Sequence, residues 1–460
     1  MSPCEVPPTQ PAVPVTGGFQ QLLNDFSVTQ NGFLPECLPL SRLPDPYYEP
    51  WEALMPHLSA LIDNGTIREK VDQLPVLSTS RLLTEPEQRR AYVVLCFLAN
   101  GYIWGGRTAS EVLPPPLTNP LLSVSSHLGL PPIATYAAFN LWNFTTSSTS
   151  ASFRDLDAVH SQHTFTGTLD ESWFYSVSIA IEASGAPLIP SLLCALEAAS
   201  RGDFPPATHA LDSFVASVQH LSTFLDRMDE NCDPDVFYHQ IRPFLAGSKN
   251  MEAAGLTRGV FYDEGDGKGE WRALRGGSNG QSSLIQFFDV VLGVEHSSGG
   301  ETTDGKGGAV SFHEEVRGYM PRSHRVFLEH VGRVFPGGMR GVLSHTHKQG
   351  SERGVTSKEE SECVAAFQRA TEALAAFRGR HLQMVTRYII IPARQAAARA
   401  EKEKGKGGVV NLATAPSAMR VTGDEGVARV ELTGTGGTAL LPFLKESRDE
   451  TVRAGQICRS

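Results

Sequence analysis

Apolar residues recur at the spacing of an α-helix from about residue 171 to about residue 400, and this long pattern constrains the fold more than any other feature. Two Gly-rich segments, 264–280 and 297–308, and a low-complexity stretch at about 336–356 interrupt it. We therefore expect a mostly α protein. The predicted helices in this part of the chain are 171–184, 187–201, 206–230, 234–246, 281–293, 312–317, 321–334 and 357–400.

The part of the chain before this pattern is shorter and less regular. Residues 50–70, 85–104 and 130–144 show helical patterns, whereas the prolines of PPPLTNPL, residues 114–121, are expected to break them. The chain around 145–170 is rich in Ser and Thr and is expected to form a linker with short strands.

These patterns divide the chain into three parts. Residues 1–25 are rich in proline and polar groups and are expected to be a disordered tail. A small helical domain is predicted at 26–160, and a large helical domain at 161–460. Within the large domain, the segment from about 395 to 437 is expected to be a mobile insert, and a short helix at 438–453 follows it.

The composition limits the classes of function. Hydrophobic residues make up 41% of the chain, which is enough to enclose an apolar cofactor, and the net charge of -10 disfavours binding of nucleic acid. The seven cysteines form no CxxC pair, so we expect neither a disulfide framework nor a structural zinc site. Without a signal peptide or an apolar run of about 18 residues, the protein is expected to be cytoplasmic, with no membrane partner.

The helix that contains FRGRHLQMVTRYIII carries His381 on an apolar face. The residues seven and four positions before His381, and three, four and seven positions after it, are apolar or aromatic. The imidazole is therefore expected to point into an apolar environment. Two interpretations stay open: a core histidine that makes one hydrogen bond, or an axial ligand of haem iron.

Two neighbouring segments could bind anions. Arg242 in DPDVFYHQIRPFLAG lies beside an apolar stripe, where it either pairs with an acid at the helix surface or binds a carboxylate through two parallel hydrogen bonds. In RGGSNGQSSLIQFFDVVLGVEH a Gly/Ser-rich turn leads into a helix, whose free N–H groups could bind a haem propionate or a phosphate. Simple capping by Ser278 or Ser282 is the alternative.

Two further patterns are not interpreted as sites. Gly434, Gly436 and Ala439 imitate a dinucleotide-binding fingerprint, but the 21 residues after Ala439 leave no room for the second strand of a βαβ unit. His345 and His347 lie in the low-complexity stretch without acidic partners at ligand spacing, so no metal site is predicted there.

Several segments, taken in order along the chain, resemble the indoleamine 2,3-dioxygenase family. They are WFYSVSIAIE, FYHQIRPFLAG, GGSNGQSSLIQFFDVVLG, RGYMPRSHRVFL, RHLQMVTRYIIIPA and GTGGTALLPFLK. The resemblance extends from about residue 45 to about 450 and is weak at the N-terminal tail and at inserts 299–308, 336–356 and 395–430. It implies a large helical domain that encloses haem b.

The resemblance also implies roles for single residues. His381 corresponds to the proximal ligand of the haem iron, Arg242 to the arginine that binds the substrate carboxylate, and Phe237 to an aromatic residue near the indole ring. Thr435 corresponds to a mobile-loop threonine near the substrate ammonium group. Three further residues correspond to residues of the substrate pocket: Tyr136, Phe174 and Ser178.

The remaining correspondences concern the distal loop and the inner wall of the pocket. Gly277 and Ser278 match the loop over the distal face of the haem, and Asp289 matches a structural aspartate in the following helix. Phe139 and Asn140 depart from the pattern, because the best-known relatives carry smaller or apolar residues there. This departure bears on substrate affinity more than on the reaction.

The family's activity is insertion of both atoms of O2 across the indole C2–C3 bond of L-tryptophan, giving N-formylkynurenine. We therefore expect L-tryptophan and O2 as substrates, a reductant that keeps the iron ferrous, a monomer, and a place in tryptophan catabolism by the kynurenine pathway, which supplies NAD. Ser178 is a poor proton acceptor, so no residue is assigned acid or base catalysis. The alternative is a haem-binding sensor or signalling relative with little turnover.

Overall fold

The computed structural model describes residues 17–296, 312–353, 357–404, 419–422, 429–432 and 440–457. Most of these residues are helical, which confirms the predicted mostly α class. The helices and strands up to residue 161 are α1 (Gly17–Asp25), α2 (Glu49–Glu52), α3 (Leu58–Asp63), α4 (Ile67–Asp72), α5 (Glu85–Trp104), β1 (Val112–Leu113), α6 (Pro115–Leu128), β2 (Phe144–Thr146) and β3 (Val159–Ser161).

The larger, C-terminal part of the chain supplies the long helices. Its elements are α7 (Leu169–Gly185), α8 (Leu188–Ser200), α9 (Phe204–Asp226), α10 (Pro234–Val236), α11 (Arg242–Leu245), β4 (Val260–Gly265), β5 (Lys268–Arg272), α12 (Ser283–Leu292), α13 (Phe312–Arg317), α14 (Arg322–Val334), α15 (Gly338–Arg353), α16 (Lys358–Val385), α17 (Ile391–Lys404), β6 (Met419–Thr422), β7 (Arg429–Leu432) and α18 (Leu440–Ala454).

Three short π-turns interrupt the regular helices. They are η4 (Ala137–Leu141), η6 (Phe237–Ile241) and η9 (Thr386–Ile390), the last of which joins α16 to α17. A π-turn inserts one extra residue into a helical turn, and such turns are frequent at functional sites. All three contribute residues to the cavity described below.

Local signals explain one helix that occupies its predicted range. Helix α5 occupies Glu85–Trp104, the predicted range, and begins with a capping box in which Thr84 and Glu87 each bond the other's backbone N–H group. Proline in its first turn lacks an N–H group that would have no partner in the helix. Most of the helix is then buried in the core.

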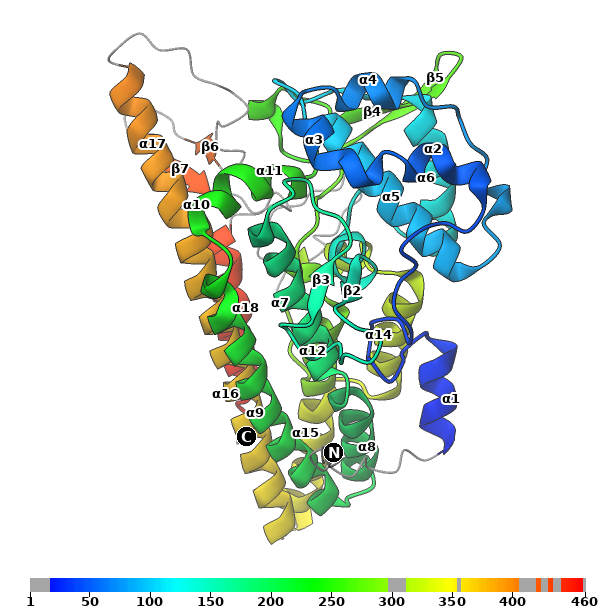
Figure 1. Ribbon diagram of the computed structural model, residues 1–460. Coiled ribbons are helices and arrows are strands. Elements are labelled where there is room, and N and C mark those ends of the chain that lie inside the picture. The colour runs from blue at the N-terminus through cyan, green and yellow to red at the C-terminus, as the bar shows by residue number, and fades with distance from the viewer. Residues whose placement is uncertain are drawn as a thin grey trace, which may run out of the picture.

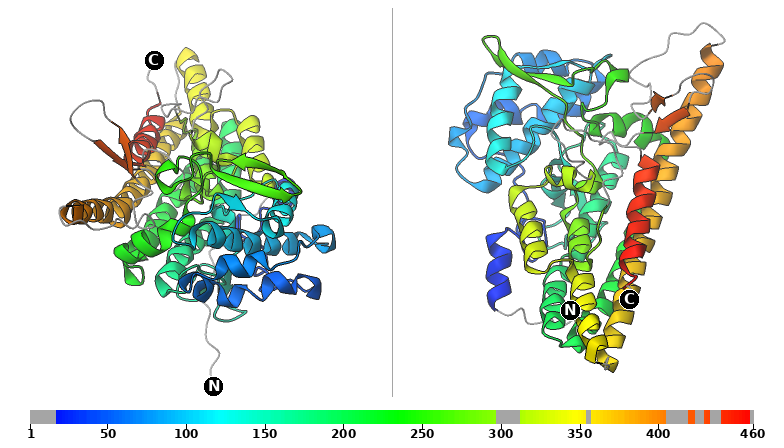
Figure 2. Two further views of the ribbon diagram at one scale, coloured as in Figure 1. Left: turned by 90° about the horizontal axis from the view of Figure 1, so that it is seen from above. Right: turned by 180° about the vertical axis from the view of Figure 1, so that it is seen from behind.

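A column of long helices forms one side of the molecule. Helix α16 packs most extensively against α9 and α18, and Figure 1 shows α17 continuing its line beyond η9. Figure 2, seen from behind, shows α18 lying along this column. The column places the C-terminal half of α16 beside α18.

The core is continuous along the chain. Buried apolar residues from Leu23 to Ala454 form a single cluster, and β1 pairs in parallel with β4, which in turn forms an antiparallel hairpin with β5. The N-terminal helices therefore share packing with the larger helical part. The proposed boundary between residues 160 and 161 stays a prediction.

One stretch is long and apolar enough to span a membrane by length and composition alone. It is Leu169–Ser200, which contains α7 and α8, and 72% of its most apolar window is buried inside the protein. Core helices have this property.

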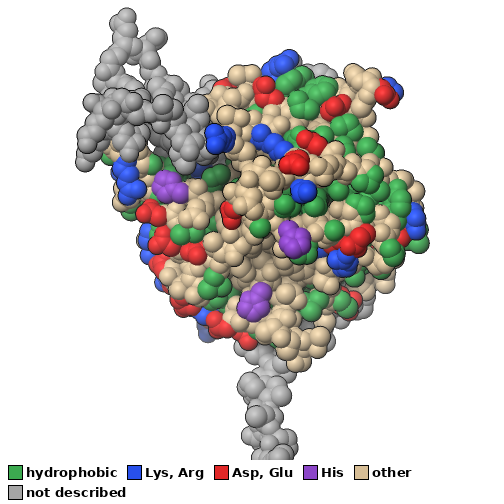
Figure 3. All heavy atoms as spheres, turned by 45° about the horizontal axis from the view of Figure 1, so that its top comes forward, with side chains coloured by type: hydrophobic (Ala, Val, Ile, Leu, Met, Phe, Trp, Pro, Cys, Tyr) green, Lys and Arg blue, Asp and Glu red, His purple; other side chains and the backbone are tan. Residues whose placement is uncertain are grey.

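On the face drawn in Figure 3, acidic and basic side chains are interspersed rather than gathered by sign.

The structure corrects several local predictions in the first part of the chain. Residues 17–25, expected in the disordered tail, form α1, whose Leu23 is buried. Most of the segment 114–121, expected to break the pattern, belongs to α6. Pro115 and Pro116 lie in the first turn of this helix, where proline is well tolerated, and Pro120 lies inside it. Of the predicted helix at 130–144, only η4 is helical.

Other corrections lie in the Gly-rich and low-complexity segments. Part of 264–280 forms the β4–β5 hairpin, and the stretch at 336–356 contains α15, so His345 and His347 lie on a helix and not in a loop. The linker at 145–170 does contain the expected short strands, β2 and β3. The segments 1–16, 297–308 and much of the expected mobile insert lie outside the described residues.

Candidate functional site

A single large cavity gathers most of the predicted site residues. Its walls come from η4, α7, the end of α9, η6, the loop after residue 276, α13, α16, η9 and α18. Its empty volume, which includes open solvent at its mouth, is about 1690 Å³. The predicted residues that line it are Tyr136, Phe174, Ser178, Phe237, Gly277, Ser278 and His381.

His381 lies on the cavity wall, on the last turns of α16. Helix α16 begins at the Ser357 cap, which accepts a hydrogen bond from the Glu360 N–H group, and the apolar face predicted around His381 is buried or lines the cavity. Enclosure by the protein and, to a smaller extent, the nearby Arg378 charge together lower the pKa of His381 to about 4. The imidazole is therefore neutral at pH 7.

The His381 ring makes no hydrogen bond with any residue that the structure describes, although it faces the cavity. A neutral imidazole with an uncommitted nitrogen lone pair can coordinate a metal. The alternative interpretation, a core histidine that makes one hydrogen bond, does not describe this ring.

A row of aromatic rings follows one wall of the cavity. The Phe237 and Phe174 ring centroids are 4.7 Å apart, those of Phe174 and Tyr175 are 5.6 Å apart, and Tyr175 stacks on Phe139 at 5.6 Å. The row thus runs from η6 at one end to η4 at the other. Such a wall suits a flat aromatic ligand.

A buried carboxylic acid, Glu182, joins three parts of the cavity wall. Its Oε1 atom accepts hydrogen bonds from the Tyr136 hydroxyl at 3.1 Å and from the Ser282 hydroxyl at 2.6 Å. Burial raises the pKa of Glu182 to about 7, although these hydrogen bonds lower it. Sequence reasoning missed Glu182, and its only signal was an acid inside the apolar helix pattern, four residues after Ser178.

The loop after residue 276 lies against η4. A Cβ atom on Gly277 would lie 2.4 Å from the Phe139 ring, so only glycine fits there. The Ser278 hydroxyl accepts a hydrogen bond from the Gly280 N–H group, and the Ser282 hydroxyl accepts one from the Ile285 N–H group. Both serines therefore act as caps, as the simpler interpretation of this segment predicted.

Arg242 is buried but does not line the cavity. It begins the short helix α11, directly after η6, and its guanidinium carbon lies 5.6 Å from the centre of the Tyr238 ring. Leu245, at the end of the same helix, does line the cavity. Along the chain, Arg242 is thus about one helical turn before a residue of the cavity wall.

Thr435, another predicted ligand-binding residue, lies outside the described residues. Helix α18 begins soon after it, at Leu440, and contributes three residues to the wall: Phe443, Leu444 and Ser447.

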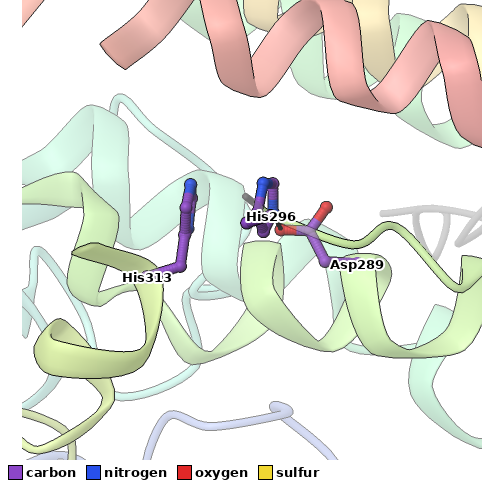
Figure 4. A group of neighbouring side chains, drawn as sticks. All are labelled: Asp289, His296 and His313. Atoms are coloured by element: carbon purple, nitrogen blue, oxygen red, sulfur yellow. Dashed lines mark hydrogen bonds and ion pairs between the residues drawn. The ribbon is translucent and has the colours of Figure 1, made fainter. Parts of the chain in front are cut away.

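Asp289, His296 and His313 form a second group of polar side chains next to the cavity. One ligand atom from each lies within 4.8 Å of the others, as a metal site requires, and Figure 4 shows His296 between the other two. However, the two imidazole rings stack with centroids 3.6 Å apart and 13° between their planes. A single ion cannot lie in both ring planes, where the nitrogen lone pairs point.

The same side chains are better described as a charge network. The His296 ring lies between two carboxylates, with Nε2 at 3.2 Å from Asp289 and Nδ1 at 2.6 Å from Glu450. Burial lowers the pKa of His296, but the Asp289 charge and these hydrogen bonds outweigh it and raise the pKa. His313 stays neutral, because burial lowers its pKa to about 3, and its Nε2 lies 3.0 Å from the Ser447 hydroxyl.

The chain matches known proteins over most of its length. A family model described as indoleamine 2,3-dioxygenase matches residues 22–454. The chain is 41% identical over 433 residues to an indoleamine 2,3-dioxygenase of Aspergillus nanangensis, covering 92% of this chain and 94% of that one.

Two further relatives cover the chain to a similar extent. An indoleamine 2,3-dioxygenase of Saccharomyces cerevisiae is 37% identical over 93% of this chain and 92% of its own length. A 6-hydroxytryptophan 2,3-dioxygenase of Fusarium equiseti is 36% identical over 92% of this chain and 95% of its own length.

Proposed function

The chain belongs to the indoleamine 2,3-dioxygenase family and is a dioxygenase, and we propose that it uses haem b and O2 to convert L-tryptophan to N-formylkynurenine. The observation that carries this proposal is the neutral, uncommitted imidazole of His381 on the wall of a large aromatic cavity. We assign His381 as the proximal ligand of the haem iron.

The residues around the cavity fit a haem. Its walls are mostly apolar, with Phe377, Met384 and Val385 on the same helix as His381, and an apolar enclosure is what a macrocycle with a neutral axial imidazole requires. Arg378, one turn before His381, also lines the cavity, and its guanidinium group is paired with the Asp289 carboxylate.

When bound, the haem supplies the iron chemistry that O2 and the indole ring need. The chain's own residues orient the substrate and exclude water. Phe237 and Phe174 provide the aromatic wall for the indole ring, and Arg242, which directly follows η6, is proposed to bind the substrate carboxylate. Ser178 faces the cavity but is a poor proton acceptor, so we assign it no general-base role.

Further parts of the proposal rest on the family resemblance. Gly277 and Ser278 would form the loop over the distal face of the haem, Tyr136 would line the substrate pocket, and Thr435 would close over the substrate ammonium group. We also propose a cytoplasmic monomer that needs a reductant to keep its iron ferrous and acts in tryptophan catabolism through the kynurenine pathway.

The test is spectroscopic and chemical. The purified protein should show a Soret band and, with ascorbate, methylene blue and L-tryptophan in air, should form N-formylkynurenine. A Soret band without product would instead support a haem-binding sensor. A folded protein without a Soret band after haem addition would refute the proposal.

A further inference from the structure

Asn140 places an amide group in the inner wall of the cavity, and the oxygen of this amide has no hydrogen-bond partner among the described residues. Its side chain lies in η4, is only 4% exposed and lines the cavity. The amide nitrogen donates a hydrogen bond to the Tyr136 carbonyl oxygen at 3.3 Å, which identifies the other end of the amide as the oxygen. That oxygen, Oδ1, is buried and has no hydrogen-bond partner among the described residues.

A buried amide oxygen without a partner is unfavourable and therefore needs an explanation. The χ2 torsion of asparagine is soft, so a small rotation of the amide can turn Oδ1 toward the cavity. A ligand with a hydrogen-bond donor at this place would satisfy it.

We propose that Asn140 is a specificity-determining residue that accepts a hydrogen bond from a hydroxyl group on the benzene ring of a hydroxylated tryptophan. The inference rests on the proposed function and names the class of substrate that the same site favours. It concerns binding, and the oxygenation step is unchanged.

The position of Asn140 along the cavity selects the benzene ring rather than the amino-acid end. The aromatic row runs from Phe237 to Phe139, the residue next to Asn140. Arg242, the proposed carboxylate ligand, follows Phe237 at the opposite end of that row. A tryptophan held by its carboxylate at the η6 end therefore directs its ring toward η4.

Polar and aromatic side chains both lie at this end of the cavity. Phe139 lies against Gly277 and leaves no space beside it. Ser178 also lines this part of the wall, next to Tyr136 and Glu182 on adjacent elements. A hydroxylated ring suits this wall better than an unsubstituted one. A relative of similar length is named a 6-hydroxytryptophan 2,3-dioxygenase, so this substrate class occurs among proteins similar to the chain.

The experiment compares ligands within each variant, so that any general loss of folding cancels. Isothermal titration calorimetry measures the dissociation constants of L-tryptophan and of its 5-, 6- and 7-hydroxy derivatives for the haem-loaded wild type and for Asn140→Leu, a variant of similar size without an acceptor. Asn140→Ala serves as a second variant if the leucine is not accommodated.

We expect at least one hydroxylated ligand to bind the wild type about tenfold more tightly than L-tryptophan, which is the size of one net hydrogen bond. In Asn140→Leu the preference should disappear. The inference would be overturned if the wild type did not prefer any hydroxylated ligand, or if Asn140→Leu kept the same preference as the wild type.

Two other outcomes are informative. An equal loss of affinity for all four ligands in Asn140→Leu would mean that Asn140 binds a group they share, such as the indole N–H, and would also overturn it. Preference without oxygenation of any ligand would instead contradict the proposed function and leave the binding role of Asn140 supported. Turnover of L-tryptophan, with no tighter binding of any hydroxylated ligand, would support the proposed function and contradict the binding role of Asn140.

Discussion

The Nη2 atom of Arg378 lies 2.7 Å from each of the two carboxylate oxygens of Asp289. Arg378 is three residues before His381 on α16, whereas Asp289 lies on α12. Burial alone would raise the pKa of Asp289, but the charges of Arg378 and His296 outweigh it and hold the pKa below its usual range. The ion pair ties α12 to α16, and thus to the helix that carries His381.

Replacing Asp289 by Asn should lower the free energy of unfolding at pH 7 by about 3 kcal/mol, because it leaves a buried guanidinium without its counter-charge. Since the pKa of Asp289 is lowered on folding, its contribution is present above the unfolded pKa of about 3.9 and declines as the pH falls below it. Urea unfolding at pH 7 and pH 3 should show a smaller effect at pH 3.

The matched control for this variant is Asp212→Asn. Asp212 pairs with Arg369 at 2.6 Å, but both side chains are about half exposed. Such a pair contributes about 0–1 kcal/mol. Equal losses in the two variants at pH 7 would show that the Arg378–Asp289 pair is no more important than a surface pair.

Replacing His381 by Ala should abolish stable haem binding while leaving a folded, helical protein. The control is His313→Ala, because His313 also lines the cavity but is stacked on His296 and lies 3.0 Å from Ser447. Haem content from the Soret band and helicity from circular dichroism check both variants. Loss of haem in His313→Ala alone would move the axial ligand to that residue.

Replacing Arg242 by Ala should raise the concentration of tryptophan needed by about one to two decades, the effect of losing roughly 1.5–3 kcal/mol from a charge-assisted pair. The Soret band should stay intact. Arg242→Lys keeps the positive charge but lacks the two parallel hydrogen-bond donors, so the tryptophan concentration it needs should lie between those of the wild type and Arg242→Ala. If tryptamine, which has no carboxylate, proved as good a substrate as tryptophan for the wild type, Arg242 would not bind a carboxylate.

Replacing Ser178 by Ala should retain most of the turnover, because the proposed reaction needs no base at this position. Steady-state rates at saturating tryptophan, normalised to haem content, measure this. A fall of several decades with normal haem content would instead show that the Ser178 hydroxyl takes part in the reaction.

Replacing Glu182 by Gln should change how stability depends on pH. Because folding raises the pKa of Glu182 to about 7, the wild type should lose stability as the pH rises from about 4 to 7, on the order of 3 kcal/mol in total. The neutral variant lacks this loss, so its stability relative to the wild type should increase over the same range and then level off. Parallel curves from thermal or urea unfolding at pH 4.5, 6 and 8 would contradict the buried, titrating carboxyl group.

Several helices could be predicted from the sequence because their signals are local. The capping box at Thr84 and the apolar face around His381 lie within a few turns of the residues they affect, so periodicity and end signals suffice. The serine caps of the 276–283 turn are local in the same way. Helix α6 was missed because prolines were read as breakers, although at a helix start they are favourable.

Which residues meet across the cavity was decided only by the tertiary structure. Glu182 bonds Tyr136 and Ser282, which are 46 and 100 residues away, and His296 meets Glu450 at a separation of 154 residues. No local pattern encodes such contacts, because they depend on how α7, α12 and α18 pack. Most of the long helices and the apolar face of α16 that carries His381 follow from local signals, since backbone hydrogen bonds and apolar spacing act within a few residues. The buried polar network and the unsatisfied amide of Asn140 arise only when those helices close around a common cavity and remove water from groups far apart in the chain.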